Sequence, residues 1–406
     1  MKVLSLFDGM ACGMLAMQAV GVKVDRYVAY EIDKYAVQTS SHNFPMIEQR
    51  GDVFEADFTE FRGFDFLVGG SPCTYWSIAQ KNNRETEASG MGWELFSQYV
   101  RALHEAQPMY FIYENNKSMA KAIRESITQS FGFEPICINS ALVSAQNRQR
   151  LYWVGKRNLD GTYSQVKVEQ PEDIGILLKD ILDSGCSWVE KSYAYTTRCQ
   201  AASVKDSLER HRHTMVAEPL NTTADGKGRT LIAGYHKQGI ENCCGFVGFG
   251  SSGVAEPVGT GYRGRSEDGA WKKRYEVRGD GKANALTTAQ TDSMVALSAT
   301  EPYAIPCEFD GGIPTRAVSC ADGKIYSVYR VVNEQVTIKG KQHHIKLADG
   351  YYIFRKLTVN ESKRLQTVPE WYEFPVSDTQ AYKLLGNGWT VVVISHLIKA
   401  ILLECT

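Results

Sequence analysis

One cysteine in the sequence stands where a thiol could act as a nucleophile. Cys73 follows the segment Gly69-Gly70-Ser71-Pro72, which itself follows the apolar run Phe64 to Val68. The run predicts a buried strand, and two glycines and a proline end it abruptly. Because α/β sheets gather ligands at the carboxyl ends of their strands, this position favours a cleft. A thiolate there suits covalent catalysis, whereas a lone cysteine is more often buried packing.

A second set of polar residues could supply an acid and cations. Glu114 ends the run Tyr110 to Tyr113, and a carboxyl held against aromatic neighbours could serve as a proton donor. Gln146, Arg148 and Arg150 alternate with a period of two, so an extended chain would place them on one face. Guanidinium groups beside an acid suit phosphate or carbonyl oxygens. A helix-initiating acid and a solvated strand face are the plain alternatives.

The first turn of the chain has the form of a nucleotide-binding loop. Phe7-Asp8-Gly9 leads to Gly13 between a predicted strand and a predicted helix. Glycines there let the backbone approach a ligand closely. The spacing is not G-x-G-x-x-G, so a plain turn between strand and helix is an equal alternative.

Two acids follow at the ends of the next strands. Glu31 closes the run Val24 to Tyr30, about 20 residues beyond the loop, where comparable folds read ribose hydroxyls. Asp52 follows Gly51, and its carboxylate could accept a hydrogen bond from adenine N6. Each acid alone is more often a solvated charge or a turn residue. Three ligand-like strand ends in succession favour a cofactor site.

The elements that must position these residues alternate between strands and helices over the first 156 residues. This alternation predicts a mostly parallel sheet with helices on both faces. A short helix is also expected over residues 174–182. The predicted strands cover residues 3–7, 24–30, 51–53, 64–68, 109–113, 134–139 and 150–156, and the helices 14–20, 35–43, 94–106 and 120–131.

The chain changes character after about residue 156. From there to about residue 352 it is rich in Gly, Thr and Tyr, with short β-like pieces. Helical patterning then returns, with Thr358 and Glu361 in the form of a capping box and a final apolar helix over residues 391–403. We therefore expect one α/β domain formed by residues 1–156 and 353–406, with a β-rich insertion over residues 157–352.

Composition narrows the class of protein. Of 406 residues, 43% are hydrophobic and 22% charged, which is ordinary for a globular protein. We see no apolar run long enough to span a membrane and no leader segment at the N-terminus. The ten cysteines contain no C-x-x-C pair, which predicts a reduced cytosolic set without a zinc site. The net charge of −1 means that any nucleic-acid-binding surface must be local.

The insertion holds such a local basic cluster. Cations and aromatic residues alternate there, which suits contacts to phosphates and base edges. A solvated charged loop is an equal reading of the cluster alone. The cations are Arg263, Arg265, Lys272, Lys273, Arg274, Arg278 and Lys282, and the aromatic residues among them are Tyr262, Trp271 and Tyr275.

Taken in order, these motifs resemble those of the DNA (cytosine-5) methyltransferase family. The resemblance covers both ends of the chain, and the ordered set is highly specific. The matching segments are Phe7-Asp8-Gly9 to Gly13, Glu31, Asp52, Ser71-Pro72-Cys73, Glu114-Asn115, Gln146-Asn147-Arg148-Gln149-Arg150, Arg355 to Gln366, and Gly386-Asn387-Gly388.

Three positions depart from the family pattern. Thr74 stands where bacterial members usually have Gln, Asn116 replaces the usual Val, and Gly388-Trp389 replaces a small residue followed by Val. The segments around Phe7 and Cys73 look more like those of vertebrate de novo methyltransferases. No regulatory region precedes the first motif, so we expect a compact bacterial or phage enzyme, cytoplasmic in a bacterial cell or an infected host.

The resemblance implies a Rossmann-like class I methyltransferase domain with an inserted target-recognition region. It implies S-adenosylmethionine as cofactor, double-stranded DNA as partner, and neither a metal, a membrane nor an obligatory protein partner. Cys73 would add to C6 of a flipped-out cytosine, and Glu114 would stabilise or protonate N3. Arg150 would hold the base O2, and Arg148 a nearby phosphate or the active-site network.

The other site residues implied by the resemblance fall into two sets, one for the cofactor and one for DNA. Thr74 to Trp93 would form a mobile lid over the flipped base. The cofactor set is Phe7, Asp8, Gly9, Gly13, Glu31, Ile32, Asp52, Val53, Pro72, Asn387 and Trp389. The DNA set is Ser71, Gln80, Gln146, Arg263, Arg265, Lys273 and Arg274.

Three other functions compete with DNA methylation. Methylation of structured RNA at cytosine C5 uses the same catalytic groups. A catalytically weak DNA-binding homologue is disfavoured because Cys73, Glu114, Arg150 and Asn387 are all present. An NAD-dependent oxidoreductase is disfavoured by the missing G-x-G-x-x-G and by the Pro-Cys turn.

Overall fold

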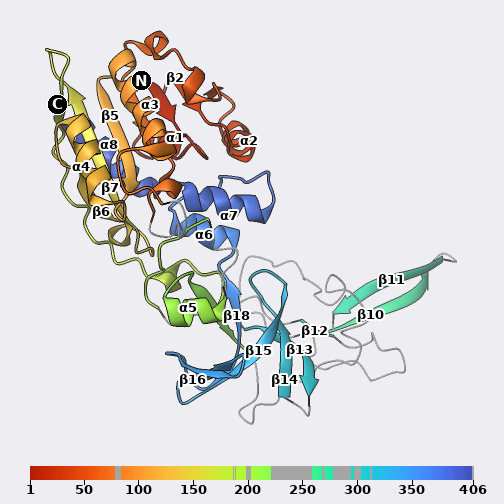
Figure 1. Ribbon diagram of the computed structural model, residues 1–406. Helices are drawn as coiled ribbons and strands as arrows, with labels where there is room; N and C mark the ends of the chain where they lie inside the picture. The colour runs from red at the N-terminus through yellow and green to blue at the C-terminus, as the bar shows by residue number, and fades with distance from the viewer. Residues whose placement is uncertain are drawn as a thin grey trace. The chain divides into compact units, whose positions relative to one another are not determined.

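The protein was analysed as a computed structural model that describes residues 1–77, 84–185, 187, 189–197, 203–220, 258–267, 270–277, 294–296, 303–310 and 313–404. The chain divides into two compact units. Unit 1 comprises residues 1–181, 189–214 and 357–406, and unit 2 comprises residues 182–188 and 215–356. Figure 1 labels the elements of both units.

Unit 1 is built on an eight-stranded sheet with the order β3-β2-β1-β4-β5-β7-β6 and with β8 paired to β7. The strands from β3 to β5 are parallel, and β7 runs antiparallel to β5 and β6. The predicted mostly parallel sheet is confirmed. The strands are β1 (Lys2–Leu6), β2 (Arg26–Tyr30), β3 (Glu48–Gln49), β4 (Phe66–Gly69), β5 (Tyr110–Asn116), β6 (Ile136–Asn139), β7 (Gln149–Arg157) and β8 (Tyr163–Gln165).

The helices of unit 1 follow most of the predicted helical segments. The α-helices are α1 (Cys12–Ala19), α2 (Lys34–Asn43), α3 (Gly90–Ala106), α4 (Lys121–Phe131), α5 (Val204–Arg210), α6 (Val359–Leu365), α7 (Asp378–Asn387) and α8 (Val391–Leu403). Short 3₁₀ turns are η1 (Val53–Glu55), η2 (Phe58–Phe61), η3 (Cys73–Tyr75), η4 (Ser140–Leu142) and η5 (Leu178–Asp180).

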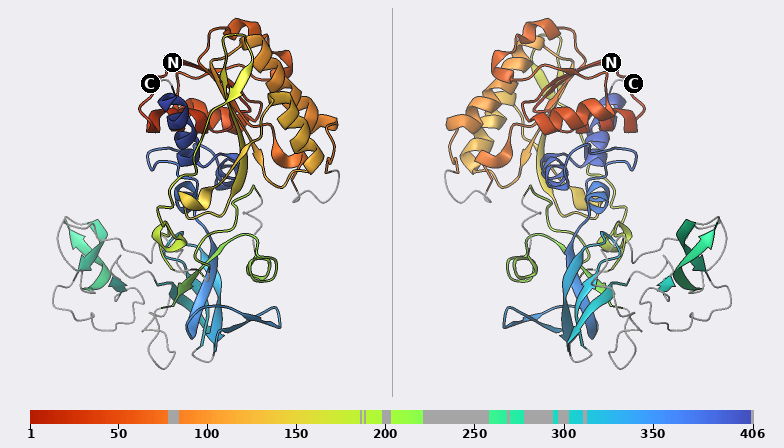
Figure 2. Two further views of the ribbon diagram at one scale, coloured as in Figure 1. Left: turned by 90° about the vertical axis from the view of Figure 1, so that its left-hand side faces the viewer. Right: turned by 90° about the vertical axis from the view of Figure 1, so that its right-hand side faces the viewer.

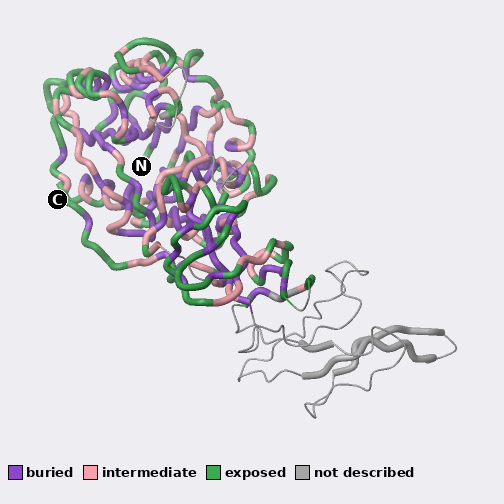
Figure 3. The backbone as a smooth tube through the Cα atoms, turned by 60° about the horizontal axis from the view of Figure 1, so that its bottom comes forward, coloured by how far each residue is buried: buried purple, intermediate pink, exposed green. Residues whose placement is uncertain are grey.

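Helices pack on both faces of this sheet because alternate strand residues point to opposite sides. On one face, the ring of Tyr113 in β5 lies 4.9 Å from that of Tyr99 in α3. On the other face, a Cβ at Gly13 of α1 would lie 2.8 Å from Tyr27 Oη and 3.3 Å from the Val68 side chain. Figure 2 shows α3 and α4 in orange on one side, with α1 in red and α8 in dark blue on the other. The buried strand residues are purple in Figure 3.

Unit 2 consists of antiparallel sheets, in line with the predicted β-rich composition. A seven-stranded sheet has the order β13-β14-β15-β16-β17, with β18 paired to β15 and β9, and a three-stranded sheet has the order β11-β10-β12. The strands are β9 (Met215–Pro219), β10 (Val258–Glu267), β11 (Ala270–Val277), β12 (Met294–Ala296), β13 (Ile305–Asp310), β14 (Ile313–Val318), β15 (Ile325–Val332), β16 (Gln335–Ile338), β17 (Lys341–His344) and β18 (Gly350–Lys356).

The limits of the two units differ from the predicted limits of the insertion, residues 157 and 352. Residues 157–181 and 189–214 belong to unit 1. The reason is local pairing: β8 extends the unit 1 sheet beside β7, and the Lys167 N–H donates to the Glu404 carboxylate at 3.0 Å. The helix predicted over residues 174–182 is wrong, because this stretch contains only the 3₁₀ turn η5.

The C-terminal helices begin as the sequence predicts. Thr358 and Glu361 form a capping box, in which the Thr358 Oγ1 accepts from the Glu361 N–H and the Glu361 carboxylate accepts from the Thr358 N–H. One described stretch, Asp378–Leu403, is long and apolar enough to cross a membrane by composition alone, contrary to our expectation. It is divided between α7 and α8 and most of it is buried, as in a core helix.

Candidate functional site

The loop after β1 has the backbone of a ligand-binding turn. Phe7, Gly9 and Ala11 have φ angles of 57°, 60° and 60°, in the left-handed region. Only glycine adopts this region without strain, and strained residues gather at functional sites. The helix α1 begins directly after the loop, and its N-cap Ala11 provides no side-chain hydrogen bond to the first amides.

Asp8 has a buried carboxylate oxygen without a partner among the described residues. Its Oδ1 accepts from Ser5 Oγ at 2.6 Å and from Tyr27 Oη at 2.7 Å, whereas Oδ2 is buried and unpaired. Desolvation by burial raises the pKa of Asp8 to about 6, and the nearby charge of Glu31 adds to the rise. An unpaired acidic oxygen inside a strained loop is suited to a ligand that carries N–H or O–H groups.

Glu31 holds the same loop from the end of β2. Its Oε2 accepts from the Gly9 N–H, and its Oε1 accepts from the N–H groups of Ile32 and Asp33, each at 2.8 Å. Both carboxylate oxygens therefore already meet backbone donors. Because Oε1 accepts two of these bonds and Oε2 only one, Oε2 has a further lone pair that can accept from a ribose hydroxyl.

Two large apolar side chains are exposed next to Glu31 and Asp52, the two acids predicted to bind a cofactor. Ile32, next to Glu31, is 76% exposed, and Phe54, next to Asp52, is 45% exposed. Asp52 itself accepts from the Phe54 N–H at 3.0 Å. The predicted contact Val53 instead packs its side chain into the core, so Phe54 is the apolar neighbour that the sequence reasoning missed. Exposed apolar side chains at two such positions fit a planar ring such as adenine.

The segment before Cys73 passes directly against Glu114. A Cβ at Gly70 would lie 2.8 Å from the Glu114 carbonyl oxygen and 2.9 Å from Glu114 Oε2. Any side chain at Gly70 would therefore displace the acid. Cys73 opens the turn η3 three residues later, and Pro72 beside it is exposed. The backbone two residues ahead of Pro72 therefore lies in contact with Glu114.

Ser71 does not fit its predicted role as a DNA contact. The residue is 3% exposed, and its hydroxyl forms a 2.7 Å hydrogen bond with Tyr113 Oη. The Asn115 side-chain amide donates to the Ser71 carbonyl oxygen at 3.1 Å. Ser71 therefore fixes the turn between β4 and Cys73 against β5, and its polar atoms are used inside the protein.

Glu114 lies at the centre of the candidate site with both carboxylate oxygens occupied. The residue is 9% exposed. Its Oε1 pairs with Arg150 Nε at 3.0 Å, and its Oε2 accepts from Trp389 Nε1 at 3.1 Å. The sequence predicted aromatic and apolar surroundings for this acid. The structure adds an ion-pair partner from β7 and an N–H donor from the segment between α7 and α8.

Arg148 binds carbonyl oxygens of the protein, whereas the resemblance implied either a nearby phosphate or the active-site network. The residue is 3% exposed. Its guanidinium donates to the carbonyl oxygens of Tyr195 at 2.8 Å, Gly386 at 3.3 Å and Gly388 at 3.0 Å. A guanidinium buried among protein carbonyls cannot also meet DNA, so the phosphate contact considered for Arg148 is a wrong prediction.

Gln146 is likewise buried, which contradicts its prediction as a DNA contact. Its side-chain oxygen accepts from the Tyr195 N–H at 2.8 Å, and its amide donates to Gln366 Oε1 at 3.2 Å. Gln366 in turn donates to the Leu385 carbonyl oxygen at 2.7 Å. The sequence reasoning missed Gln366 as a site residue, although it closes one of the matching motifs.

The C-terminal segment is joined to the loop after β1 and to the start of α2 by contacts that no local pattern indicates. Asn387 is exposed at the end of α7. Lys383 in the same helix pairs with Asp33 at 2.7 Å. Tyr372 Oη donates to the Met10 carbonyl oxygen at 2.6 Å. These contacts join α7 and the segment before it to the start of α2 and to the loop after β1.

The basic cluster of the insertion forms an antiparallel hairpin of β10 and β11. The register partners are Arg263 with Arg274, Arg265 with Lys272, and Gly264 with Lys273. Because alternate residues of a strand share a face, four cations belong to one face and Lys273 belongs to the other. The predicted residues Gln80, Arg278 and Lys282 lie outside the described residues.

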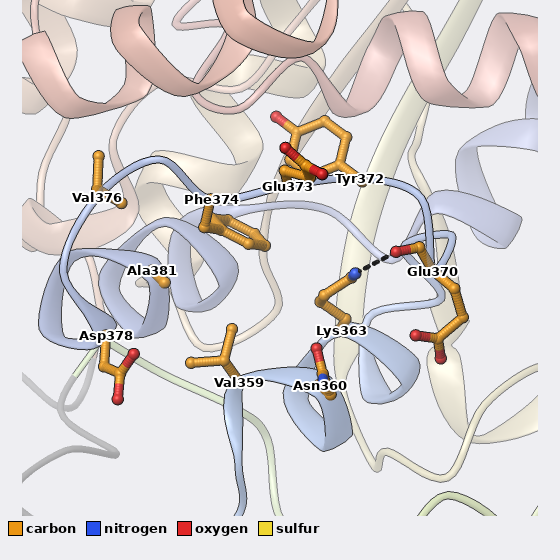
Figure 4. Close-up of a pocket in the computed structure, with 10 residues that line it drawn as sticks. All are labelled: Val359, Asn360, Lys363, Glu370, Tyr372, Glu373, Phe374, Val376, Asp378 and Ala381. Carbon is orange, nitrogen blue, oxygen red and sulfur yellow. Dashed lines mark hydrogen bonds between the residues drawn. The ribbon is translucent and has the colours of Figure 1, made fainter. Parts of the chain in front are cut away.

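A cavity of about 320 Å³ lies elsewhere in unit 1 (Figure 4). Lys363 donates there to the Glu370 carbonyl oxygen at 2.7 Å, and desolvation lowers the pKa of Lys363. The cavity contains none of the predicted site residues. It is lined by Val359, Asn360, Lys363, Glu370, Tyr372, Glu373, Phe374, Val376, Asp378 and Ala381. Within the part of the chain that the structure describes, no group of His, Cys, Asp and Glu is arranged to hold a metal ion.

Comparison with known proteins identifies related sequences across the whole chain. The family model of C-5 cytosine-specific DNA methylases matches residues 1–403. The orphan methyltransferase M.SPRI of Bacillus phage SPR is 33% identical over 233 residues, which cover 52% of this chain and 50% of that protein. The type II methyltransferase M1.ScrFI of Lactococcus lactis subsp. cremoris is 27% identical over 259 residues, covering 59% and 63%.

These matches span about half to two thirds of the relatives' own length. Among solved structures, a DNMT2 mutant from Spodoptera frugiperda superimposes with a TM-score of 0.52 and 14% identity, covering 99% of both chains. At that identity the similarity concerns the fold alone.

Proposed function

We propose, from the premise that this chain belongs to the family of C-5 cytosine-specific DNA methylases, that it transfers a methyl group from S-adenosylmethionine to C5 of cytosine in double-stranded DNA. One observation carries the proposal beyond family membership. The backbone ahead of Cys73 contacts Glu114, and Glu114 is paired with Arg150. These contacts support a site in which Cys73 would act as the nucleophile beside the acid Glu114, after the carboxyl ends of β4 and β5, with Arg150 at the start of β7 as the cation.

The loop after β1 and the residues beside it fit S-adenosylmethionine. Glu31 would accept from the ribose hydroxyls, and Ile32 and Phe54 would flank the adenine ring. The unpaired Asp8 Oδ2 would receive the ammonium group. When bound, the cofactor supplies an electrophilic methyl carbon on a sulfonium sulfur. Phe7 and Gly9 in the same loop, Gly13 in α1, Asp52 after β3, Pro72 after β4 and Asn387 at the end of α7 would supply further contacts to the cofactor.

The residues of this chain would activate the base by covalent catalysis. The Cys73 thiolate forms a bond to C6, and the electron pair of the C5–C6 double bond moves into the ring. Glu114 stabilises N3 or gives it a proton, so that C5 becomes nucleophilic towards the methyl group. After transfer, loss of the C5 proton to solvent re-forms the double bond and expels the thiolate, and any proton on N3 returns to Glu114. Arg150 holds Glu114 and the base O2.

The cytosine must leave the duplex to reach Cys73, because C6 is inaccessible inside the base stack. Flipping costs a few kcal/mol, which contacts to DNA must offset. The insertion over residues 157–352 would provide target recognition, with the hairpin of β10 and β11 as a source of phosphate contacts. We assign the protein to DNA modification or restriction evasion in the cytoplasm of a bacterial cell or a phage-infected host.

Base-resolution cytosine-methylation sequencing tests the proposal directly. The chain and its Cys73→Ser variant are expressed in a bacterial strain that lacks cytosine methyltransferases, with Cys137→Ser as a matched cysteine control. We expect 5-methylcytosine in a fixed sequence context with the parent and with the control, and none with Cys73→Ser. The Cys73→Ser protein should still bind S-adenosylhomocysteine by calorimetry.

The outcomes separate the competing functions. Methylated RNA with unmodified DNA would support the RNA methyltransferase alternative. Unmodified DNA and RNA, with specific DNA binding retained, would indicate a catalytically inactive binding homologue. Methylation by Cys73→Ser at the parental rate would refute the assignment of the nucleophile.

A further inference from the structure

We propose that Trp389 is a positioning residue for Glu114, so that the segment between α7 and α8 sets the geometry of the acid in the active site. The inference rests on the proposed function for its kinetic consequence. Its structural basis is independent of that function, because it consists of the 3.1 Å hydrogen bond from Trp389 Nε1 to Glu114 Oε2.

The two partners of Glu114 bind different oxygens and come from different elements. Arg150 on β7 forms an ion pair with Oε1, and Trp389 donates a hydrogen bond to Oε2. One partner alone leaves the carboxylate free to rotate about its terminal torsion, which is broad in glutamate. Two partners fix the plane of the carboxylate. The free lone pairs, which must face the base, are then directed by the protein.

The position of the indole is itself fixed on both sides. The residue before it, Gly388, accepts through its carbonyl oxygen from the Arg148 guanidinium at 3.0 Å. The residue after it, Thr390, donates through its hydroxyl to Gln366 Oε1 at 3.1 Å. At the other edge of the indole, a Cβ at Gly13 would lie 3.9 Å from Trp389 Cζ3. The ring therefore reaches from the first turn of α1 to Glu114.

The Trp389 N–H should affect the rate of methyl transfer, because it helps to set the position of Glu114. Glu114 must approach N3 of the base within hydrogen-bond reach. Misplacement of a reacting group by about 1 Å can cost about a hundredfold in rate. Trp389 touches the acid and not the reacting atoms of the base, so it acts through Glu114. Loss of its N–H should therefore lower the rate of chemistry only while Glu114 is present.

A double-mutant cycle tests this dependence. Trp389→Phe removes the N–H and keeps an aromatic ring. We expect it to slow single-turnover methyl transfer roughly tenfold to a hundredfold, because hydrogen bonds to charged groups are strong. The dissociation constant of S-adenosylhomocysteine should change by a smaller factor. In a Glu114→Gln background, adding Trp389→Phe should change the rate by less than about twofold. Trp371→Phe, at an exposed tryptophan away from the site, is the matched control.

A spectroscopic readout in the ligand-free protein does not depend on activity. The indole N–H resonance of Trp389 is identified by its loss in Trp389→Phe. A hydrogen bond to a carboxylate moves such a resonance downfield, so Glu114→Gln should move it upfield and leave the Trp371 resonance in place. An unmoved Trp389 resonance in Glu114→Gln would overturn the inference, as would equal rate losses from Trp389→Phe in both backgrounds.

These results distinguish the inference from the proposed function. Absence of methyl transfer by the parent, or an unaffected rate in Glu114→Gln, would refute the function and leave the resonance test to decide the contact. A slow Glu114→Gln variant with an independent Trp389→Phe effect would refute only the positioning role.

Discussion

Arg148 donates a hydrogen bond of 3.0 Å to the carbonyl oxygen of Gly388, 240 residues further along the chain. The same guanidinium binds the carbonyl oxygens of Tyr195 and Gly386. It therefore joins the segment that leads into β7 to the end of α7. Since β7 carries Arg150 and the segment after α7 carries Trp389, Arg148 holds together the two elements whose side chains bind the Glu114 carboxylate.

Replacement of Arg148 by Lys should destabilise the protein without directly weakening DNA contacts. The shorter ammonium cannot reach all three carbonyl oxygens, and buried unsatisfied groups cost about 1–3 kcal/mol each. We expect the free energy of unfolding, measured in urea, to fall by about 2–4 kcal/mol. Arg150→Lys is the matched control and should mainly slow methyl transfer. If Arg148→Lys keeps the stability of the parent but binds DNA more weakly, the result would instead support a contact between Arg148 and a phosphate.

Asp8 should make the stability of the protein depend on pH in an unusual direction. Burial raises the pKa of Asp8 from 3.8 to about 6 in the folded state. Between these values the native protein holds a proton that the unfolded chain has released. The contribution of Asp8 is therefore fully present below about pH 4 and is lost as the pH rises through about 6, an effect of about 2–3 kcal/mol.

Asp8→Asn isolates this contribution, because other carboxylates titrate equally in both proteins. The variant should be more stable than the parent at pH 8, and the difference should shrink as the pH falls to 4.5. Urea unfolding at several pH values measures it. A difference that stays constant with pH would contradict the assignment. Loss of the charge should also weaken binding of S-adenosylhomocysteine at pH 8, if Asp8 receives its ammonium group.

Tyr372 should support cofactor binding from outside the cofactor site. Its hydroxyl donates to the Met10 carbonyl oxygen in the loop after β1. Tyr382 provides a matched control, because its hydroxyl donates to the Leu357 carbonyl oxygen, at 2.9 Å, away from that loop. We expect Tyr372→Phe and Tyr382→Phe each to cost about 1 kcal/mol of stability. Only Tyr372→Phe should weaken S-adenosylhomocysteine binding in calorimetry, and equal affinities would refute the link.

The hairpin of β10 and β11 contains two neighbouring lysines that belong to opposite faces, and this difference allows a matched test. Lys272 is the register partner of Arg265 and shares a face with Arg263 and Arg274, whereas Lys273 belongs to the opposite face. If the cationic face meets phosphates, Lys272→Ala should weaken DNA binding and reduce the salt slope by about 1. Lys273→Ala should have a smaller effect. Equal losses, measured by fluorescence anisotropy across salt concentrations, would refute the one-faced contact.

Local patterns in the sequence predicted most of the elements of unit 1. Apolar runs ended by glycine or by acids became β1, β2, β4 and β5, and the Thr358–Glu361 pair became a capping box. These features depend on neighbours within a few residues. The helix predicted over residues 174–182 failed because that stretch is held by contacts with distant residues, such as the Leu178 N–H to the Glu190 carbonyl oxygen at 2.7 Å.

The sequence by itself therefore determined the family, the mostly parallel sheet with helices on both faces, and the identity of Cys73 and Glu114 as candidate groups. It could not assign Ser71, Gln146 and Arg148, because burial of a polar side chain depends on what packs over it. Nor could it pair Trp389 with Glu114, which lie 275 residues apart. Hydrogen bonds between such distant positions exist only when packing of the sheet and helices brings them together, so tertiary structure alone decided the geometry of the acid.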